Sequence, residues 1–460
     1  MRIALALLFL GLLSFSPIQA KHYAFRLLLK DKGKTSPRME QPERFLSAAS
    51  LVRRSRQGIP LADTDIPISS DYLRAIAEDG SHIVVQSKWL SSVVVRVEDS
   101  AKVERLKALP FVKRVCCVWS GELPKAADVD ADGGRKADPN LTSNIENKEE
   151  KTKAYHGAAA LQIEMLDGAK LHQAGFRGEN MTVAILDEGF ENVDRIALFD
   201  SSRIVGTKNI INPQQSVFER DDHGTEVLSC MATNMPHVYV GTAPKADYWL
   251  IRTEDASSEY PIEEDYWVAG LEFADSVGVD VVSSSLGYFQ FDEELEEPRR
   301  QSDLDGKTAF ITRGAQLAIS KGILLFSSAG NEGDSDWGTL TFPADAPDVL
   351  TIGSITRKKK TSSFSSPGFV RAGYVKPDLV ALGTNVAVVS ANGVVCRANG
   401  TSFATPIVAG LGVCLWQALP HLTSQEVVSL LRQSACRYRK PTQEQGYGIP
   451  QVYKYYKKKR

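Results

Sequence analysis

Short apolar runs without polar alternation recur along the chain from about residue 156 onward. Such runs are typical of parallel strands that are buried on both faces. They are MTVAIL (181–186), DYWLIR (247–252), VDVVSSS (279–285), GILLFSS (322–328) and VLTIGSI (349–355). Helical stretches at 263–278 and 308–322 lie between some of them. The pattern therefore predicts an α/β fold with a doubly wound, mostly parallel sheet.

A different order of elements occupies residues 21 to about 119. Strand-like and helix-like segments follow one another as strand, helix, strand, strand, helix, strand. The segments are 23–29, 71–79, 82–98 (two strands), 100–109 and 111–119. This order predicts a small α+β unit of ferredoxin-like type. An insertion at 32–70 carries the basic stretch LVRRSRQ, which we interpret as a solvated helix face.

The segment between these two regions has almost no large apolar residues. Residues 121–153 are rich in Asp, Glu, Lys, Asn, Gly and Ala, so we expect an exposed linker. Within it, DVDADG (128–133) resembles the start of a calcium loop, but Pro139 stands where a bidentate glutamate is needed. No CxxC or HExxH motif occurs. We therefore predict no metal and no cofactor, although a structural calcium without a recognisable ligand set stays open.

The first twenty residues have the pattern of a secretory signal peptide. Arg2 precedes the apolar run IALALLFLGLL (3–13), and small residues lead to Ala20. The run is too short to span a bilayer, and no second long apolar run follows, so we expect no transmembrane anchor. The interpretation places the protein outside the cytoplasm, in the periplasm, in the cell envelope or in the medium.

The composition of the chain argues against some classes of binding partner. The chain has 460 residues, of which 43% are apolar, and 54 basic residues nearly balance 56 acidic ones. A net charge of −2 gives no overall attraction to nucleic acid or to an anionic membrane, so we predict no nucleic-acid partner. The six cysteines are too few for a disulfide-based scaffold, and one pairing among the last four stays open.

Four polar residues follow the predicted strands or open helical segments of the larger region. They are Asp187 in LDEG, His223 in DDHGT, Asn331 in AGNEG and Ser402 in NGTSFATP. Each one alone has an ordinary structural explanation, as a turn former or a helix cap. In open α/β sheets, however, sites form at the carboxyl ends of the strands, where these residues are expected.

Together, the four motifs resemble those of the subtilisin-like serine proteases over about residues 156–450, in the family's order Asp, His, Ser. The resemblance implies that Ser402 is the nucleophile, His223 the base and Asp187 the residue that orients the imidazole. It also implies that the Asn331 amide and the Ser402 N–H form an oxyanion hole. The chain looks most similar to exported peptidases of Bacteroidetes-type bacteria.

The resemblance extends to substrate binding and to the N-terminal unit. Ser285, Leu286 and Gly287 would form an edge on which an extended polypeptide substrate adds as a strand, with Ala329 and Gly330 on the opposite wall. The ferredoxin-like unit resembles the family's propeptides, so the chain's own propeptide is expected to act as an intramolecular inhibitor. The flexible linker is where cleavage would be easiest.

Two residues depart from the commonest family pattern. Glu188 stands where many members have Ser or Thr, and Glu226 stands where His is common. Both add negative charge beside the predicted triad, so we expect them to raise the pKa of His223.

The predicted organisation has five parts, and the function that fits it is that of a secreted serine endopeptidase made as a zymogen. The parts are a signal peptide (1–20), a ferredoxin-like propeptide domain (21–120), a linker (121–155), a subtilisin-like catalytic domain (156–455) and a basic tail (456–460). Two alternatives remain: a peptide ligase or cyclase on the same scaffold, and a non-catalytic peptide-binding relative. The second is expected to lack at least one of the four motif residues.

Overall fold

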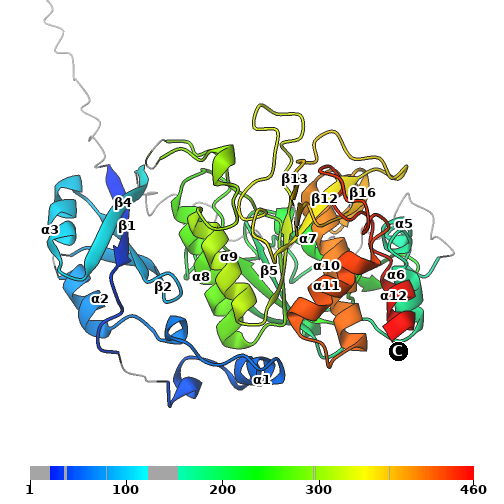
Figure 1. Cartoon of the computed structure of the whole chain (residues 1–460), viewed down its shortest axis with the longest axis horizontal. Coiled ribbons are helices and arrows are strands. Elements are labelled where there is room, and N and C mark those ends of the chain that lie inside the picture. The colour runs from blue at the N-terminus through cyan, green and yellow to red at the C-terminus, as the bar shows by residue number, and fades with distance from the viewer. Residues whose placement is uncertain are drawn as a thin grey trace, which may run out of the picture.

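The computed structural model describes residues 21–35, 39–78, 80–122, 154–293, 295, 297–371 and 373–459. The predicted signal peptide and most of the predicted linker lie outside the described residues. Two domains lie side by side (Figure 1), with the N-terminal domain in blue and cyan against the green helices of the larger one.

The larger domain is built on a seven-stranded sheet in which every neighbouring pair is parallel. The strand order is β15-β12-β11-β10-β5-β9-β6. The bounds are β5 Thr182–Asp187, β6 Ile204–Asn209, β9 Asp247–Arg252, β10 Val281–Ser284, β11 Leu324–Ser328, β12 Leu350–Ile355 and β15 Leu379–Leu382. The predicted parallel α/β sheet is therefore confirmed, and all five predicted strands belong to it.

Helices cover both faces of this sheet, and successive residues of the central strand β5 enter different cores. Val183 and Ile185 of β5 pack with α7 and α10 in one apolar cluster, whereas Ala184 and Leu186 pack with α8 and α9 in another. The helices are α7 His223–Ala232, α8 Ile262–Val277, α9 Phe310–Ser320 and α10 Thr401–Ala418. The sheet is thus doubly wound, as predicted.

Helix α10 is the central helix of the first core. By length and composition it is the single described helix that could cross a membrane, but 89% of it is buried inside the protein. Around it lie α5 Ala160–Glu164, α6 Gly168–Gln173, α11 Ser424–Ser434 and α12 Val452–Lys459. Three short hairpins complete the domain: β7 Asn234–Met235 with β8 Tyr239–Val240, β13 Phe369–Arg371 with β14 Tyr374–Lys376, and β16 Val386–Val389 with β17 Val395–Ala398.

The N-terminal domain is an antiparallel sheet of order β2-β3-β1-β4. Its elements are β1 His22–Leu29, α2 Ser70–Ala77, β2 His82–Ser87, β3 Ser92–Val97, α3 Val103–Ala108 and β4 Val112–Gly121. One face of the sheet forms a core with α2 and α3. This is the predicted ferredoxin-like unit. The other face packs on the start of α8, where Ala24 and Val94 contact Ile262 and Tyr266.

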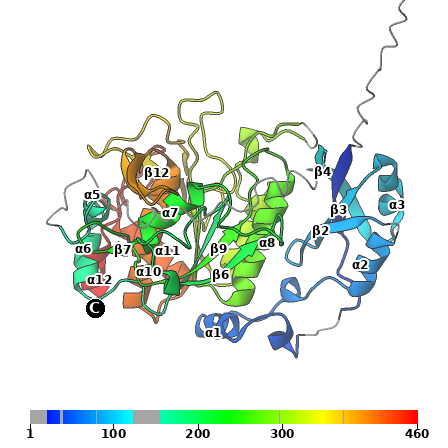
Figure 2. The same cartoon turned by 180° about the vertical axis from the view of Figure 1, so that it is seen from behind.

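The basic stretch of the insertion is only partly solvated: Arg56 is exposed but Arg53 and Arg54 are buried, so the sequence interpretation of this helix was wrong for two of its three arginines. It forms α1 Ala48–Arg56, which lies beneath the larger domain (Figures 1 and 2). Arg53 and Arg54 are both 2% exposed, whereas Val52 is 66% exposed. The arginines turn inward because Asp275, at the end of α8, and Asp65 supply buried carboxylates for them.

Candidate active site

The end of β5 and the start of α7 bring Asp187 and His223 together. Asp187 is fully buried, and its Oδ1 lies 2.7 Å from Nδ1 of His223. The backbone N–H of Glu188 donates to the same oxygen at 3.0 Å. Gly224 makes this approach feasible, since a Cβ at this position would lie 2.2 Å from the carbonyl oxygen of Gly189. The predicted pair of base and orienting carboxylate is therefore in hydrogen-bonding geometry.

Ser402 lies in the first turn of α10, beside this pair. The ring of the adjacent Phe403 lies 5.8 Å from the His223 ring, and α7 packs against α10. Within the described residues, the Ser402 hydroxyl donates to the carbonyl oxygen of Ser285 at 3.4 Å and forms no hydrogen bond with the imidazole. Such bonds are often formed only once substrate is bound.

Asn331 is fixed against the start of the same helix. Its Oδ1 accepts from the backbone N–H of Thr401 at 2.9 Å and from the Thr401 hydroxyl at 3.0 Å. This arrangement leaves the amide N–H groups of Asn331 available as donors. The first N–H groups of α10, including that of Ser402, have no acceptor inside the helix. Two kinds of donor thus gather next to the Ser402 hydroxyl.

The segment after β10 leaves backbone groups without partners. Within the described part of the chain, Leu286 and Gly287 make no backbone hydrogen bond. The Leu286 side chain is buried in the second core, so only its backbone can contact a ligand. A Cβ on Gly287 would lie 2.1 Å from the Thr341 hydroxyl oxygen. Ser285 contacts the predicted nucleophile, because its hydroxyl donates to the Ser402 carbonyl at 2.8 Å.

Ala329 and Gly330 lie between β11 and Asn331, but most of their backbone N–H and carbonyl groups already form hydrogen bonds within the protein. The Ala329 N–H donates to Ile352, its carbonyl accepts from Thr341, and the Gly330 carbonyl accepts from Ser366. Gly330 has a φ of +100°, which favours glycine. Their predicted role as the opposite wall stays a prediction.

More acidic side chains lie near His223 than the sequence motifs predict. Burial lowers the pKa of His223, but the charge and hydrogen bond of Asp187 and the charges of Glu188 and Glu254 raise it to about 9. Burial, and then the charge of Asp187, raise the pKa of Glu188 to about 7. Burial and then Asp222 raise the pKa of Glu226, whereas His223 lowers it.

Glu254 is the residue of this group that the sequence analysis did not identify. Its Oε2 accepts from the Tyr288 hydroxyl at 2.9 Å, and burial raises its pKa. It stands two residues after the end of strand β9, and an acidic residue just beyond a strand end is the signal that could have identified it. Tyr288 donates to Glu254, and Thr401 donates to Asn331. Nothing in the sequence marks these two residues except that each stands next to a motif.

No metal site or disulfide occurs in the described part of the chain. No group of three or more His, Cys, Asp or Glu side chains there is arranged to hold a metal ion. None of the six cysteines forms a disulfide.

Comparison with known proteins gives two matches to family profiles. The subtilase family (peptidase S8) matches residues 178–448, and the Bacteroidota propeptide domain of peptidase S8 matches residues 24–131. Subtilisin E of Bacillus subtilis is 29% identical over 292 residues, covering 61% of this chain and 67% of that protein. Subtilisin of Bacillus pumilus is 29% identical over 284 residues, covering 59% and 90%. The M-protease of Shouchella clausii is 26% identical over 309 residues, covering 67% and 71%.

Proposed function

Because the chain belongs to the subtilase family of serine endopeptidases and carries an N-terminal propeptide domain, we propose that it is an exported zymogen that cleaves peptide bonds through Ser402, His223 and Asp187. The observation that carries the assignment of residues is the 2.7 Å contact between Asp187 and His223 beside the start of α10.

In the proposed reaction, the Ser402 oxygen attacks the carbonyl carbon of the scissile bond. A serine hydroxyl is a weak nucleophile at neutral pH, so His223 Nε2 takes its proton as the new bond forms. The hydroxyl must first leave the Ser285 carbonyl, a 3.4 Å contact that is weak by hydrogen-bond standards. His223 then protonates the leaving amine, and water hydrolyses the acyl-enzyme by the same steps.

Charge develops on two groups during this reaction, the imidazole and the oxygen of the scissile carbonyl, and protein groups stabilise each of them. The imidazolium is stabilised by Asp187, which also fixes the tautomer because Nδ1 donates to it. The negative oxygen of the tetrahedral intermediate would accept from the Asn331 amide and the Ser402 N–H. The positive end of the α10 dipole lies at the same point.

The free backbone groups of Leu286 and Gly287 support an extended peptide as the substrate. A chain lying along this segment can pair with them as an added strand, which selects backbone rather than any one side chain. Export through residues 1–20 and release of the propeptide domain within the linker complete the proposal. In the uncleaved chain, the propeptide domain covers the start of α8.

The test is a peptide-library cleavage assay on the processed protein, with Ser402→Ala as the control. We expect cleavage by the native chain and none by the variant. Cleavage that survives in Ser402→Ala would contradict the mechanism, and products of increased mass on a defined peptide would indicate a ligase instead. N-terminal sequencing of the secreted protein tests export and identifies the linker bond that is cut.

A further inference from the structure

Two chain segments flank the start of α10, one after strand β10 and one after strand β11. Residues 285–287 form the first segment, and its Ser285 forms one hydrogen bond in each direction with Ser402. Residues 329–330 form the second segment and directly precede Asn331. The space between the segments therefore begins beside the groups that would act on the scissile carbonyl.

This space is where the side chain of one substrate residue has to fit. The residue that supplies the scissile carbonyl, P1, carries its side chain on the carbon next to that carbonyl. In the proposed reaction the carbonyl lies against Ser402 and the Asn331 amide, so the P1 side chain must enter between the two segments. We call these segments the walls of the P1 pocket.

A third segment closes the space between the walls. The backbone N–H of Thr341 donates to the carbonyl of Ala329 at 3.2 Å. The next residue, Phe342, exchanges two hydrogen bonds of 2.9 Å with Tyr288, which directly follows the first wall. Thr341 is 3% exposed. The backbone is thus attached to both walls, and this fixes the position of the Thr341 side chain.

The side chain of Thr341 contacts one glycine of each wall. A Cβ on Gly287 would lie 2.1 Å from the Thr341 hydroxyl oxygen. A Cβ on Gly330 would lie 2.8 Å from the Thr341 methyl carbon and 3.0 Å from the hydroxyl oxygen. Non-bonded carbon atoms pack at about 3.5–4.0 Å, so no further carbon atom fits between Thr341 and either glycine. Thr341 therefore fills the space between the walls.

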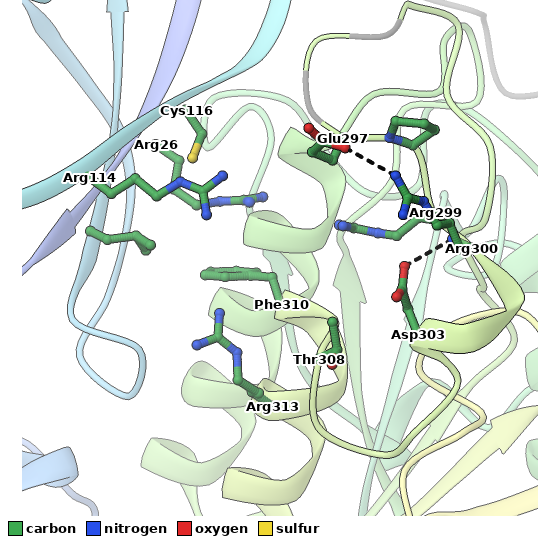
Figure 3. Close-up of a pocket in the computed structure, with 12 residues that line it drawn as sticks. Arg26, Arg114, Cys116, Glu297, Arg299, Arg300, Asp303, Thr308, Phe310 and Arg313 are labelled. Atoms are coloured by element: carbon green, nitrogen blue, oxygen red, sulfur yellow. Dashed lines mark hydrogen bonds and ion pairs between the residues drawn. The ribbon is translucent and has the colours of Figure 1, made fainter.

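Two cavities at the domain interface do not offer this space. One, of about 340 Å³, is lined by residues that include Arg26 and Arg114 of the propeptide domain and Arg299 and Arg313 of the catalytic domain (Figure 3). The other, of about 810 Å³, lies between the propeptide sheet and the loop after β9. Among the described residues, neither cavity is lined by a residue of the walls. A P1 side chain must therefore fit in front of Thr341.

We propose that Thr341 is the residue that determines specificity at P1, because it makes the pocket shallow and selects substrates with Gly, Ala or Ser at this position. The inference rests on the proposed function. A pocket can discriminate by excluding what does not fit, and a single methylene changes kcat/KM by about 10- to 200-fold. Within the part of the chain that the structure describes, the Thr341 hydroxyl has no hydrogen-bond partner. The volume of this side chain, rather than its polarity, is thus what sets the preference.

The test measures kcat/KM of the processed protein on peptide anilides that differ only at P1, which is Gly, Ala, Leu or Phe. We expect the parent to prefer Ala to Leu by about tenfold or more. Thr341→Gly removes the side chain and should move the ratio of Leu to Ala by about tenfold or more toward Leu. The matched control is Thr341→Val, which replaces the hydroxyl by a methyl group of similar size and should keep the preference of the parent.

Equal cleavage after Ala, Leu and Phe by the parent would overturn the inference but not the proposed function, since peptide bonds would still be cut. An unchanged ratio of Leu to Ala in Thr341→Gly would also overturn it, as would an equal shift of the ratio in Thr341→Val. If Thr341→Gly does not fold, Thr341→Ala takes its place, because it also shortens the side chain. A parent that cleaves none of the peptides would contradict the proposed function itself, and the inference with it.

Discussion

The carboxylates around His223 determine at which pH this imidazole can act as a base. A base must be neutral, so activity falls as the pH drops through the pKa of His223. Negative neighbours stabilise the imidazolium and move this acid limb to higher pH. Asp187 is indispensable to the proposed mechanism, but Glu188 and Glu254 are not, and they account for part of the rise in the pKa of His223 to about 9.

The first prediction concerns Glu188→Gln. Removing this charge lowers the pKa of His223, so the acid limb of kcat/KM should move down by up to about one pH unit. The measurement is a pH profile on one peptide substrate. The exposed Glu164→Gln, on α5, serves as the control and should leave the profile unchanged. A limb that stays in place or moves upward in Glu188→Gln would refute the electrostatic account.

The second prediction concerns Asn331→Ala. Loss of the side-chain donor should lower kcat about a hundredfold to a thousandfold with little change in KM, the magnitude known for the equivalent donor of subtilisin. Because Asn331 Oδ1 also accepts from Thr401, a comparison with Thr401→Val separates loss of the donor from loss of its support. Equal kcat values for Asn331→Ala and the parent would remove Asn331 from the oxyanion hole.

Individual residues could be predicted from the sequence where the chemistry is local. Asp187, His223, Asn331 and Ser402 each stand in a short motif at a strand end or helix start, so the order of motifs was enough to find them. The environment of Glu254 could not be derived this way, because its partner Tyr288 comes from another strand end. Arg53 and Arg54 were misjudged for the same reason, since the acid at the end of α8 is more than two hundred positions away.

At the level of elements, helix α1 is held by charge rather than by apolar contact. Asp275 accepts from both Arg53 and Arg54, and Arg54 also makes two contacts of 2.9 Å with Asp65. Buried ion pairs of this kind contribute little compared with apolar packing, but the loss of one partner leaves a buried charge uncompensated.

The third prediction follows from this arrangement and concerns Asp275→Asn. The substitution should destabilise the docked α1 by about 3–5 kcal/mol and lower the thermal midpoint of the Ser402→Ala protein. The matched control is Asp71→Asn, which removes an exposed pair with Arg74 and should change the midpoint little. If both substitutions have the same small effect, α1 does not depend on its buried charges.

The strands show why some elements could be predicted from the sequence and others could not. The five predicted strands are mostly buried on both faces, so their sequences show little alternation of apolar and polar residues. Strand β6 was missed because it lies at one edge of the sheet with alternate residues exposed; β15, at the other edge, was also missed, although its four residues are all buried. Edge strands contact one neighbour, and this weakens the pattern that identifies them.

For the whole molecule, the proposed zymogen mechanism makes the contact between the two domains decide when activity appears. Glu272 of α8 is central to it, because its carboxylate accepts from the backbone N–H groups of Lys88 and Trp89 and from the Ser87 hydroxyl, at the turn between β2 and β3. Charged acceptors make such hydrogen bonds stronger than neutral ones.

The fourth prediction concerns Glu272→Gln. A neutral amide accepts fewer and weaker bonds from this turn, so the cut propeptide domain should dissociate several-fold faster and activity should appear earlier. The measurement is the lag before peptide hydrolysis begins, together with kcat/KM after the lag. We expect a shorter lag and an unchanged final kcat/KM. A change in the final kcat/KM with the same lag would contradict a role confined to docking.

Helix α1 contacts the end of α8 through Asp275, whereas the propeptide sheet packs on the start of α8 at Ile262 and Tyr266, and both belong to one continuous N-terminal chain. Two attachments joined in this way act as a bivalent ligand, in which each keeps the other at high effective concentration. Cutting the linker therefore does not by itself free the enzyme. When one of the two contacts dissociates alone, it forms again before the other contact dissociates. A second cut between α1 and the sheet would leave two separate ligands, each of which binds weakly. The insertion at residues 32–70 is therefore the place where the timing of propeptide release can be controlled.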